Sequence, residues 1–299
     1  MMQNKIFLAF VLLTFSTLFW SGNFLVAKLA YNSSLPPLKL SFFRWFIAFL
    51  IILPFTYRSI FKNIFLIKKN LKIIIFLSVL SVAIFNSFTY IAMQSTLVIN
   101  ASLMGSIAPL FILFFSFIIF KNKTNFFQFF GIILSIIGVS CIVLKGDVNN
   151  LIYLNFTPGD LWMLIAVMAW ALYSVMLKKL DINLPQITTL SVMIFFGLIF
   201  IFPFYIYESI TYDFLPMKIS DLFMIFYVAI FAGIFSYLFW NKGVSIIGAN
   251  RSGVFLHLIP FFSAIWAITF LNEAFAIYHI FGIIFIAIGI LFANKKVNL

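Results

Sequence analysis

The sequence predicts an all-α integral membrane protein with ten transmembrane helices, arranged as two inverted five-helix repeats with both termini cytoplasmic. Three observations predict this fold class. The composition is too apolar and too poor in charge for a soluble protein. Ten apolar stretches have about the length of a membrane span, and the two halves of the chain repeat each other.

Apolar residues make up 65% of the 299 residues, and charged residues only 9%. Because soluble domains contain about 25% charged residues, this balance indicates an exterior solvated by lipid. The net charge of +12 is explained by lysines that flank membrane spans, so we expect a lipid bilayer, and no nucleic acid, as partner. The single cysteine, Cys141, excludes an internal disulfide or a cysteine metal site, and we expect no metal and no cofactor.

The apolar stretches define the predicted helices, because a span needs about 20 mostly apolar residues. The first stretch, Phe7 to Ala27, is too long for the core of a signal peptide and is interpreted as an uncleaved span. The longest break between helices, 145–157, ends in Thr157 and Pro158, which suit the cap and first position of a helix. The predicted helices cover residues 6–28, 38–57, 72–94, 98–120, 126–144, 158–178, 187–207, 219–241, 248–271 and 276–294.

Charge placement predicts the orientation in the membrane. With the N-terminus inside, every acidic residue except Asp181 falls outside. Most basic residues then fall inside: Lys5, Arg58, Lys62, Lys68, Lys69, Lys72, Lys121, Lys123, Lys178, Lys179, Lys242, Arg251, Lys295 and Lys296. We therefore predict a multi-pass protein of the cell inner (cytoplasmic) membrane.

The two halves of the chain are related by a shift of about 151 residues. Each half has an odd number of predicted helices, so the second half must cross the membrane in the opposite sense, as in many transporters. We predict repeats at 1–146 and 157–299, joined by a loop at 147–156. The matched positions include Phe88 with Phe239, Pro109 with Pro260, Gly131 with Gly282 and Gly138 with Gly289, and at a shift of 150, Trp20 with Trp170.

Several motifs resemble those of the drug/metabolite transporter (DMT) superfamily, and within it the EamA-type ten-helix carriers. They are Phe19–Lys28 (FWSGNFLVAK), Phe42–Trp45 (FFRW), Tyr90–Leu103 (YIAMQSTLVINASL) followed by Pro109, and Phe270–Ile290 (FLNEAFAIYHIFGIIFIAIGI). The match covers essentially the whole chain. Two departures are Asn122, where the family often has a second Glu to match Glu273, and the lack of a second-half counterpart to Arg44. The resemblance implies solute transport, often export of amino acids or other metabolites.

Two polar stripes are candidate gates. Asn86, Tyr90 and Gln94 share one face of the third predicted helix, because they are spaced by four residues. Their counterparts in the second half are Tyr237, Asn241 and Ser245, at the opposite depth. Such stripes suit outer and inner gates, although hydrogen bonding between helices would produce the same pattern.

Aromatic and polar residues on the first and sixth predicted helices are candidates for the solute site. Trp20 and Asn23 are paired by the duplication with Trp170 and Tyr173 and would form an aromatic wall. A place in the interfacial aromatic belt is the alternative, and Trp240 is assigned to that belt.

His257 lies near the middle of the ninth predicted helix, opposite Ser106 in the repeat. A histidine at that depth binds a solute, couples transport to protons, or is neutral and hydrogen-bonded within the bundle. Pro109 and Pro260 interrupt equivalent helices, which indicates either hinges near a transport site or packing kinks.

Arg44 lies within the second predicted helix, about six residues from its start. Its side chain either reaches the outer headgroups or pairs with a helix-end carbonyl or an anionic solute group. The remaining predicted wall is aromatic and neutral, which suits zwitterions or modestly polar metabolites. We expect helices 1, 3, 4, 6, 8 and 9 to line the cavity and helices 5 and 10 to brace it.

These features favour a secondary transporter or exporter of small organic solutes, such as amino acids or related metabolites, that works by alternating access. A scaffold or accessory subunit would explain the apolar helices but not the inverted duplication. An enzyme is disfavoured, because the chain has two histidines, no HExxH or GxSxG motif and no two carboxylates within a span. The sequence leaves open the solute, the coupling ion, and whether the protein is a monomer or a homodimer.

Overall fold

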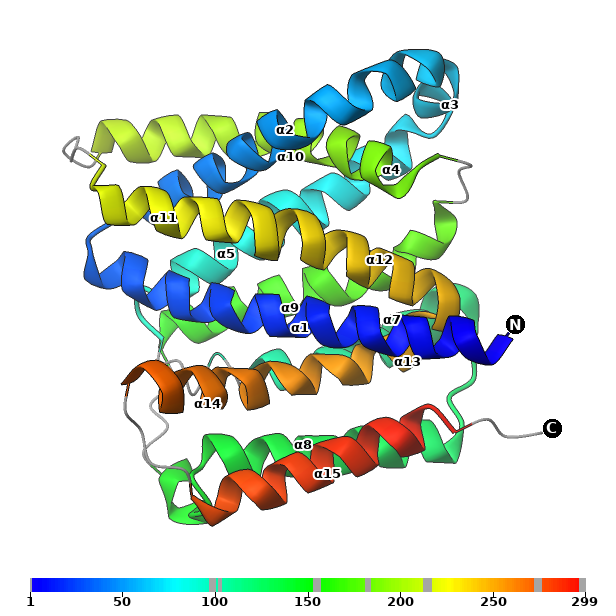
Figure 1. The fold of residues 1–299 in the computed structure, drawn as a ribbon, viewed down its shortest axis with the longest axis vertical. Coiled ribbons are helices and arrows are strands. Elements are labelled where there is room, and N and C mark those ends of the chain that lie inside the picture. Colours follow the sequence, from blue (N-terminus) through cyan, green and yellow to red (C-terminus); the bar gives the residue numbers. More distant parts are fainter. Residues whose placement is uncertain are drawn as a thin grey trace.

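The computed structural model describes residues 2–96, 101, 104–152, 157–180, 184–211, 217–271 and 276–295, and all regular structure in these residues is helical (Figure 1). Seven of the described helices are long and apolar enough to cross a membrane, and two shorter apolar helices cover Met104–Phe120 and Ile277–Ala293. The protein is therefore an all-α membrane protein, in agreement with the predicted class.

Helices of the first half follow the predicted order, with shifts of up to five residues at most ends, whereas the start predicted at residue 98 lies outside the described residues. A π-helical segment, η1, interrupts the third predicted helix between α4 and α5. The elements are α1 (Met2–Asn32), α2 (Pro37–Lys62), α3 (Ile64–Lys69), α4 (Leu71–Ser78), η1 (Val79–Ile84), α5 (Phe85–Ala92), α7 (Ala108–Phe120) and α8 (Phe126–Val143).

The second half repeats this plan, again with a π-helical segment, η4, inside its third long helix. After the short 3-10 turn η2 (Val148–Leu151), its elements are α9 (Pro158–Met176), η3 (Leu177–Lys179), α10 (Gln186–Thr211), α11 (Ile219–Tyr227), η4 (Val228–Phe235), α12 (Ser236–Ile247), α13 (Ala249–Gly253), η5 (Val254–His257), α14 (Leu258–Leu271) and α15 (Ile277–Ala293).

The start of α9 is built as its sequence predicts. Pro158 occupies the first turn, where its missing N–H costs no hydrogen bond. The backbone N–H of Thr157 donates to Asp160 Oδ2 at 2.6 Å, and Thr96 Oγ1 donates to the same carboxylate group. Gly159 packs so tightly that an added Cβ would lie 2.5 Å from the Ala92 carbonyl oxygen. This corner joins α9 to the end of α5.

Equivalent helices of the two halves run in opposite directions, as α1 and α9 show in Figure 1. The pair α8 and α15 packs antiparallel along one side of the bundle. A Cβ on Gly131 would lie 2.5 Å from Gly289 O, and one on Gly138 would lie 2.6 Å from Gly282 O. The four glycines are therefore close-packing contacts between these two helices, and their spacing of seven residues places the two glycines of each helix on one face.

A pseudo-twofold axis passes through the bundle centre. A residue that touches its own repeat partner must lie at such an axis. Three hydrogen bonds join residues 151 positions apart: Asn86 Nδ2 to Tyr237 Oη (2.9 Å), His257 Nε2 to Ser106 O (2.8 Å) and Ser135 Oγ to Ile286 O (3.5 Å). The rings of Trp20 and Trp170, related by the shift of 150, also touch, with centroids 4.8 Å apart.

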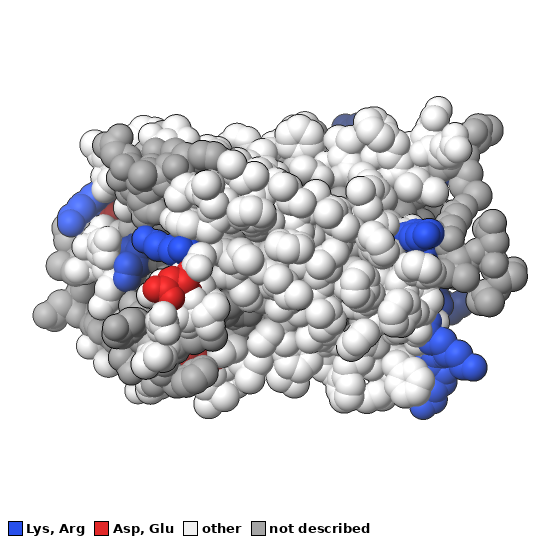
Figure 2. All heavy atoms as spheres, turned by 90° about the horizontal axis from the view of Figure 1, so that it is seen from below, with Lys and Arg blue, Asp and Glu red and all other residues white. Residues whose placement is uncertain are grey.

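Both described chain ends lie at the same end of the bundle, which we call the terminal end, and we call the opposite end the far end (Figure 1). On the face shown in Figure 2, charged side chains gather at the two ends and leave a broad uncharged band between them. Such a band is what the hydrocarbon core of a bilayer requires.

Candidate functional site

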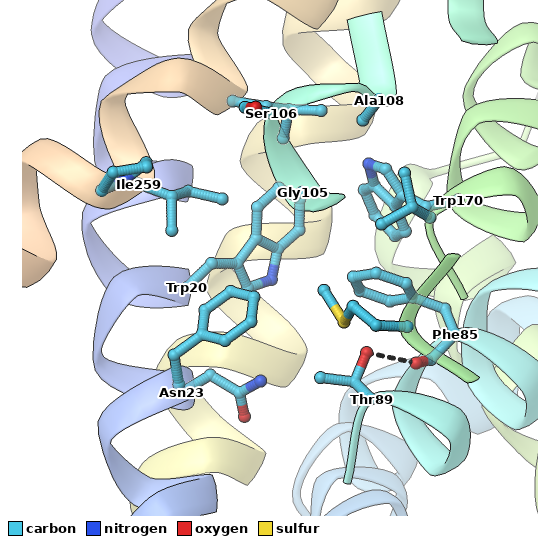
Figure 3. Close-up of a pocket in the computed structure, with 14 residues that line it drawn as sticks. Trp20, Asn23, Phe85, Thr89, Gly105, Ser106, Ala108, Trp170 and Ile259 are labelled. Carbon is cyan, nitrogen blue, oxygen red and sulfur yellow. Dashed lines mark hydrogen bonds between the residues drawn. The ribbon is translucent and has the colours of Figure 1, made fainter. Parts of the chain in front are cut away.

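A small hollow of about 40 Å³ lies at the bundle centre, beside the pseudo-twofold axis (Figure 3). Its walls come from α1, α5, α9, the segment that starts α7, and η5 with α14. It is lined by Trp20, Asn23, Phe24, Phe85, Thr89, Gly105, Ser106, Ala108, Met163, Val167, Trp170, Leu256, Ile259 and Pro260. Of the predicted solute-site residues, the structure thus brings together Trp20, Asn23, Ser106 and Trp170.

Arg44 of α2 is fully buried next to this hollow. Its Nη1 donates to Asn23 Oδ1 (3.2 Å), Asn86 Oδ1 (2.5 Å) and Tyr90 Oη (2.8 Å). The side chain therefore does not reach the headgroups, which excludes one of its predicted alternatives. The guanidinium also lies 4.8 Å from the ring centroid of Trp45, a cation–π contact.

The two π-helical segments supply carbonyl acceptors at equivalent positions of the repeats. A π turn disrupts the regular i to i−4 bonding of a helix and is frequent at functional sites. Ala232 O in η4 accepts from Trp20 Nε1 (3.0 Å) and Arg44 Nη2 (2.9 Å). Ser81 O in η1, its repeat counterpart, accepts from Asn86 Nδ2 (2.7 Å) and Tyr237 Oη (2.6 Å).

Two tyrosine–asparagine pairs are related by the inverted repeat. Tyr90 Oη donates to Asn23 Oδ1 at 2.7 Å, and Tyr173 Oη donates to Asn241 Oδ1 at 2.8 Å. The tyrosine of one pair is equivalent to the asparagine of the other, so the same bond is made with the residue types exchanged. Both pairs are formed in this structure.

A much larger cavity, of about 730 Å³, opens at the terminal end, and we call it the vestibule. Along α9 and into η3, Trp170 lines the hollow, Tyr173 follows it, and Ser174 and Leu177 line the vestibule. Asn241 also lines the vestibule, so the Tyr173–Asn241 pair stands between the two spaces. The basic residues of its wall are Lys178, Lys242 and Arg251, and no acidic residue is among its described lining residues.

Trp240 corrects one prediction from the sequence. It is fully buried rather than in an interfacial belt, its Nε1 donates to Ser174 Oγ (3.2 Å), and its ring lies 5.5 Å from Trp20 and 5.6 Å from Trp170. Its position three residues after Tyr237 places both on one helix face, which is the sequence signal that groups Trp240 with the central residues.

Other predicted residues occupy supporting positions. His257 is fully buried, and because a carbonyl only accepts, its Nε2 carries the proton donated to Ser106 O. It is not among the residues that line the hollow.

The α-helices resume immediately before Pro109 and two residues before Pro260, so both prolines follow a break in regular α-helix. Gln94 is exposed in the turn after α5, apart from Asn86 and Tyr90.

Glu208 is a supporting residue that sequence reasoning missed. It is buried, and its two carboxylate oxygens accept from the backbone N–H groups of Leu38 (3.0 Å) and Lys39 (2.7 Å) in the first turn of α2. A carboxylate at a helix N-terminus satisfies orphan donors and complements the helix dipole. Glu208 thereby anchors the helix that carries Arg44.

Comparison with known proteins identifies the family. The model of the EamA-like transporter family matches residues 7–144 and again residues 157–295. The uncharacterized transporter YyaM of Bacillus subtilis is 24% identical over 233 residues, which is 78% of this chain and 76% of the relative. An uncharacterized transporter of Archaeoglobus fulgidus is 27% identical over 268 residues, or 88% of this chain and 89% of the relative.

A solved crystal structure of a protein with 15% sequence identity shares the fold, with a TM-score of 0.73 and 97% of each chain covered. The two matches to one family model, one in each half of the chain, agree with the antiparallel pairing of equivalent helices. The chain belongs to the EamA-like transporter family, and it is a multi-pass membrane protein of transporter type.

Proposed function

We propose that the protein is a secondary carrier that moves small organic solutes, such as amino acids or related metabolites, across the cytoplasmic membrane by alternating access. The observation that carries this proposal is the pair of equivalent Tyr–Asn contacts, Asn23–Tyr90 and Tyr173–Asn241, on either side of one central hollow. A carrier needs a barrier on each side of its site that can open while the other stays closed.

The hollow is too small for a metabolite, because ligand sites usually measure about 300–1,000 Å³, whereas it measures about 40 Å³. The vestibule, at about 730 Å³, is of ligand size. In the proposed cycle, a structure with both pairs formed would be an occluded state with an approach from the terminal end. Parting of Tyr173 and Asn241 would join the hollow to the vestibule, and parting of Asn23 and Tyr90 would open it toward the far end.

Ten spans with both termini in the cytoplasm would place the vestibule on the cytoplasmic side. The basic residues of its wall support that orientation, since Lys and Arg are enriched in cytoplasmic segments. A solute arriving from the cytoplasm would then enter the vestibule first, which favours export.

The proposal is tested with purified protein reconstituted in liposomes. We expect saturable movement of at least one member of a broad panel of labelled amino acids and metabolites, above the rate of protein-free liposomes. A scaffold or accessory subunit would move none of them, and that result would overturn the proposed function.

A further inference from the structure

The buried charge of Arg44 is solvated without being neutralised. All of its hydrogen-bond partners are uncharged: the Asn23 and Asn86 amide oxygens, the Tyr90 hydroxyl and the Ala232 carbonyl. The described acidic residues are held elsewhere, with Asp160, Glu208 and Asp221 at helix N-termini. A full positive charge inside a membrane protein is costly, and proteins keep it where a function uses it.

Only one layer of side chain separates this charge from the hollow. Asn23 both lines the hollow and accepts from Arg44 Nη1 at 3.2 Å. The same Asn23 oxygen is held by Tyr90 at 2.7 Å. Parting of this pair would take at least one of the two residues away from Arg44 Nη1 and would leave the guanidinium with a free donor on the side of the hollow.

Trp170, which lines the hollow, carries a donor that has no partner among the described residues. Trp170 is 2% exposed, and its Nε1 is one of six buried side-chain atoms in the described residues without a hydrogen-bond partner. In Figure 3 this residue lines the hollow beside Trp20, whose ring it contacts. A buried N–H left without an acceptor costs about 1–3 kcal/mol, so it requires an explanation.

The repeat explains why this donor is free. Trp20 Nε1 donates to Ala232 O, so by symmetry Trp170 Nε1 would donate to Ser81 O. That carbonyl is already occupied by Asn86 and Tyr237. The symmetry is therefore broken in a way that leaves one indole N–H for a solute.

We infer that the solute of the proposed carrier bears an anionic group, a carboxylate or one of similar chemistry. Trp170 Nε1 would donate a hydrogen bond to the solute, and the Arg44 guanidinium would balance the charge of its anionic group. This inference rests on the proposed function and adds to it the charge of the solute. A zwitterion with a carboxylate satisfies it as well as a simple acid does. The basic wall of the vestibule, with Lys178, Lys242 and Arg251, would attract the same class of solute.

A solute whose only charge is positive is disfavoured by the same arrangement. It would bring a second cation next to Arg44 and would leave the Trp170 N–H without an acceptor. The apolar part of the wall, with Phe24, Phe85 and Leu256, suits a solute whose remaining body is apolar or aromatic.

The test compares solutes that share a body and differ in charge. Binding to protein in lipid nanodiscs is measured by thermal shift and calorimetry for benzoate, benzamide and benzylammonium, for isovalerate, isovaleramide and isoamylammonium, and for leucine and leucinamide. We expect the carboxylate-bearing member of each set to bind about tenfold or more tightly than its amide or amine. In Arg44→Gln this preference should disappear.

Trp170→Phe supplies a second variant, because it keeps a ring in place and removes a donor that makes no bond within the protein. We expect a folded protein whose carboxylate binding is weaker by about five- to tenfold, the worth of one hydrogen bond. The smaller ring lowers the melting temperature by itself, because Trp170 packs on Trp20 and Trp240. Trp162→Phe, the same change at a partly exposed position of α9 that packs on Phe88, is the matched control and should leave binding unchanged.

Equal or tighter binding of the amide or ammonium members would overturn the inference, as would binding of no carboxylate at all. So would unchanged carboxylate binding in both Arg44→Gln and Trp170→Phe. If the liposome panel shows transport of neutral or cationic solutes only, the anionic solute is wrong while the carrier stands. If the panel shows no transport of any solute, it is the carrier function that fails.

Discussion

At the scale of single residues, the centre of the molecule is a polar network inside an apolar bundle. Asn86 and Tyr237 are central, since each is the repeat partner of the other and both bind Ser81 O. A tyrosine hydroxyl in such a place donates one bond and accepts another, so a ring without the hydroxyl leaves two buried groups short of a partner.

Tyr237→Phe should therefore destabilise the protein. The Ser81 carbonyl and the Asn86 amide each lose one bond, at a cost of about 1–3 kcal/mol, and we expect a melting temperature lower by a few degrees. The measurement is thermal unfolding in detergent, monitored by intrinsic fluorescence. Tyr207→Phe, at a residue that is 72% exposed, is the control. Equal melting temperatures for the two variants would contradict the assigned bonds.

The sequence predicted which residues form this network better than it predicted which hydrogen bonds they make. The spacing of Asn86 and Tyr90 placed them on one face, and the repeat paired Asn23 with Tyr173. The acceptor of Arg44 Nη2 could not be identified from sequence, because it is a backbone carbonyl, Ala232 O, that a π turn presents. The residue types around a backbone carbonyl do not show whether that carbonyl is available to accept a hydrogen bond from a side chain.

At the scale of elements, α2 depends on Glu208 of α10 for its first turn. From sequence this carboxylate was predicted to lie outside the membrane and had no assigned partner, because its contact joins residues 170 positions apart. Such long-range caps are invisible to local motifs.

Glu208→Gln tests this cap. A carboxylate accepts from both Leu38 and Lys39, whereas an amide offers one acceptor oxygen and a donor that faces another donor. We expect a loss of about 1–3 kcal/mol, read as a lower melting temperature. Asp147→Asn, which removes a carboxylate from an exposed 3-10 turn, should have a smaller effect. A reversed order would contradict the anchoring of α2 by Glu208.

The pair α8 and α15 was predictable from sequence, because its glycines recur every seven residues in both halves. Gly138→Ala should destabilise it, since the added Cβ would lie 2.6 Å from Gly282 O and force the backbones apart. Overpacking of this kind costs about 1–3 kcal/mol. Ile137→Ala, at a neighbouring side chain that is 46% exposed, is the control in the same unfolding measurement. If Gly138→Ala melts at the temperature of the unmodified protein, the close contact is wrong.

At the scale of the whole molecule, the inverted repeat organises everything else. The order of the long helices and the equivalence of the halves were predictable, because hydropathy and internal similarity carry both. Five of the six residues of the two predicted stripes are at the network or the vestibule, and Gln94 is not, because α5 ends at Ala92 before that turn of the stripe. Trp240 was wrongly assigned to the interfacial belt, because its position along the helix does not reveal its ring contact with Trp20 of α1.

The central claim is that Asn23–Tyr90 and Tyr173–Asn241 are the two barriers of one carrier. It is tested in a Cys141→Ser background by two double variants, Asn23→Cys with Tyr90→Cys and Tyr173→Cys with Asn241→Cys. Each is treated with a reducible bifunctional maleimide, and liposome flux is measured with the best-transported solute of the panel. We expect either cross-link to stop flux and reduction to restore it. In the single-cysteine variants, we expect treatment with the reagent to leave flux unchanged. Flux that continues through either fully cross-linked pair would contradict the central claim.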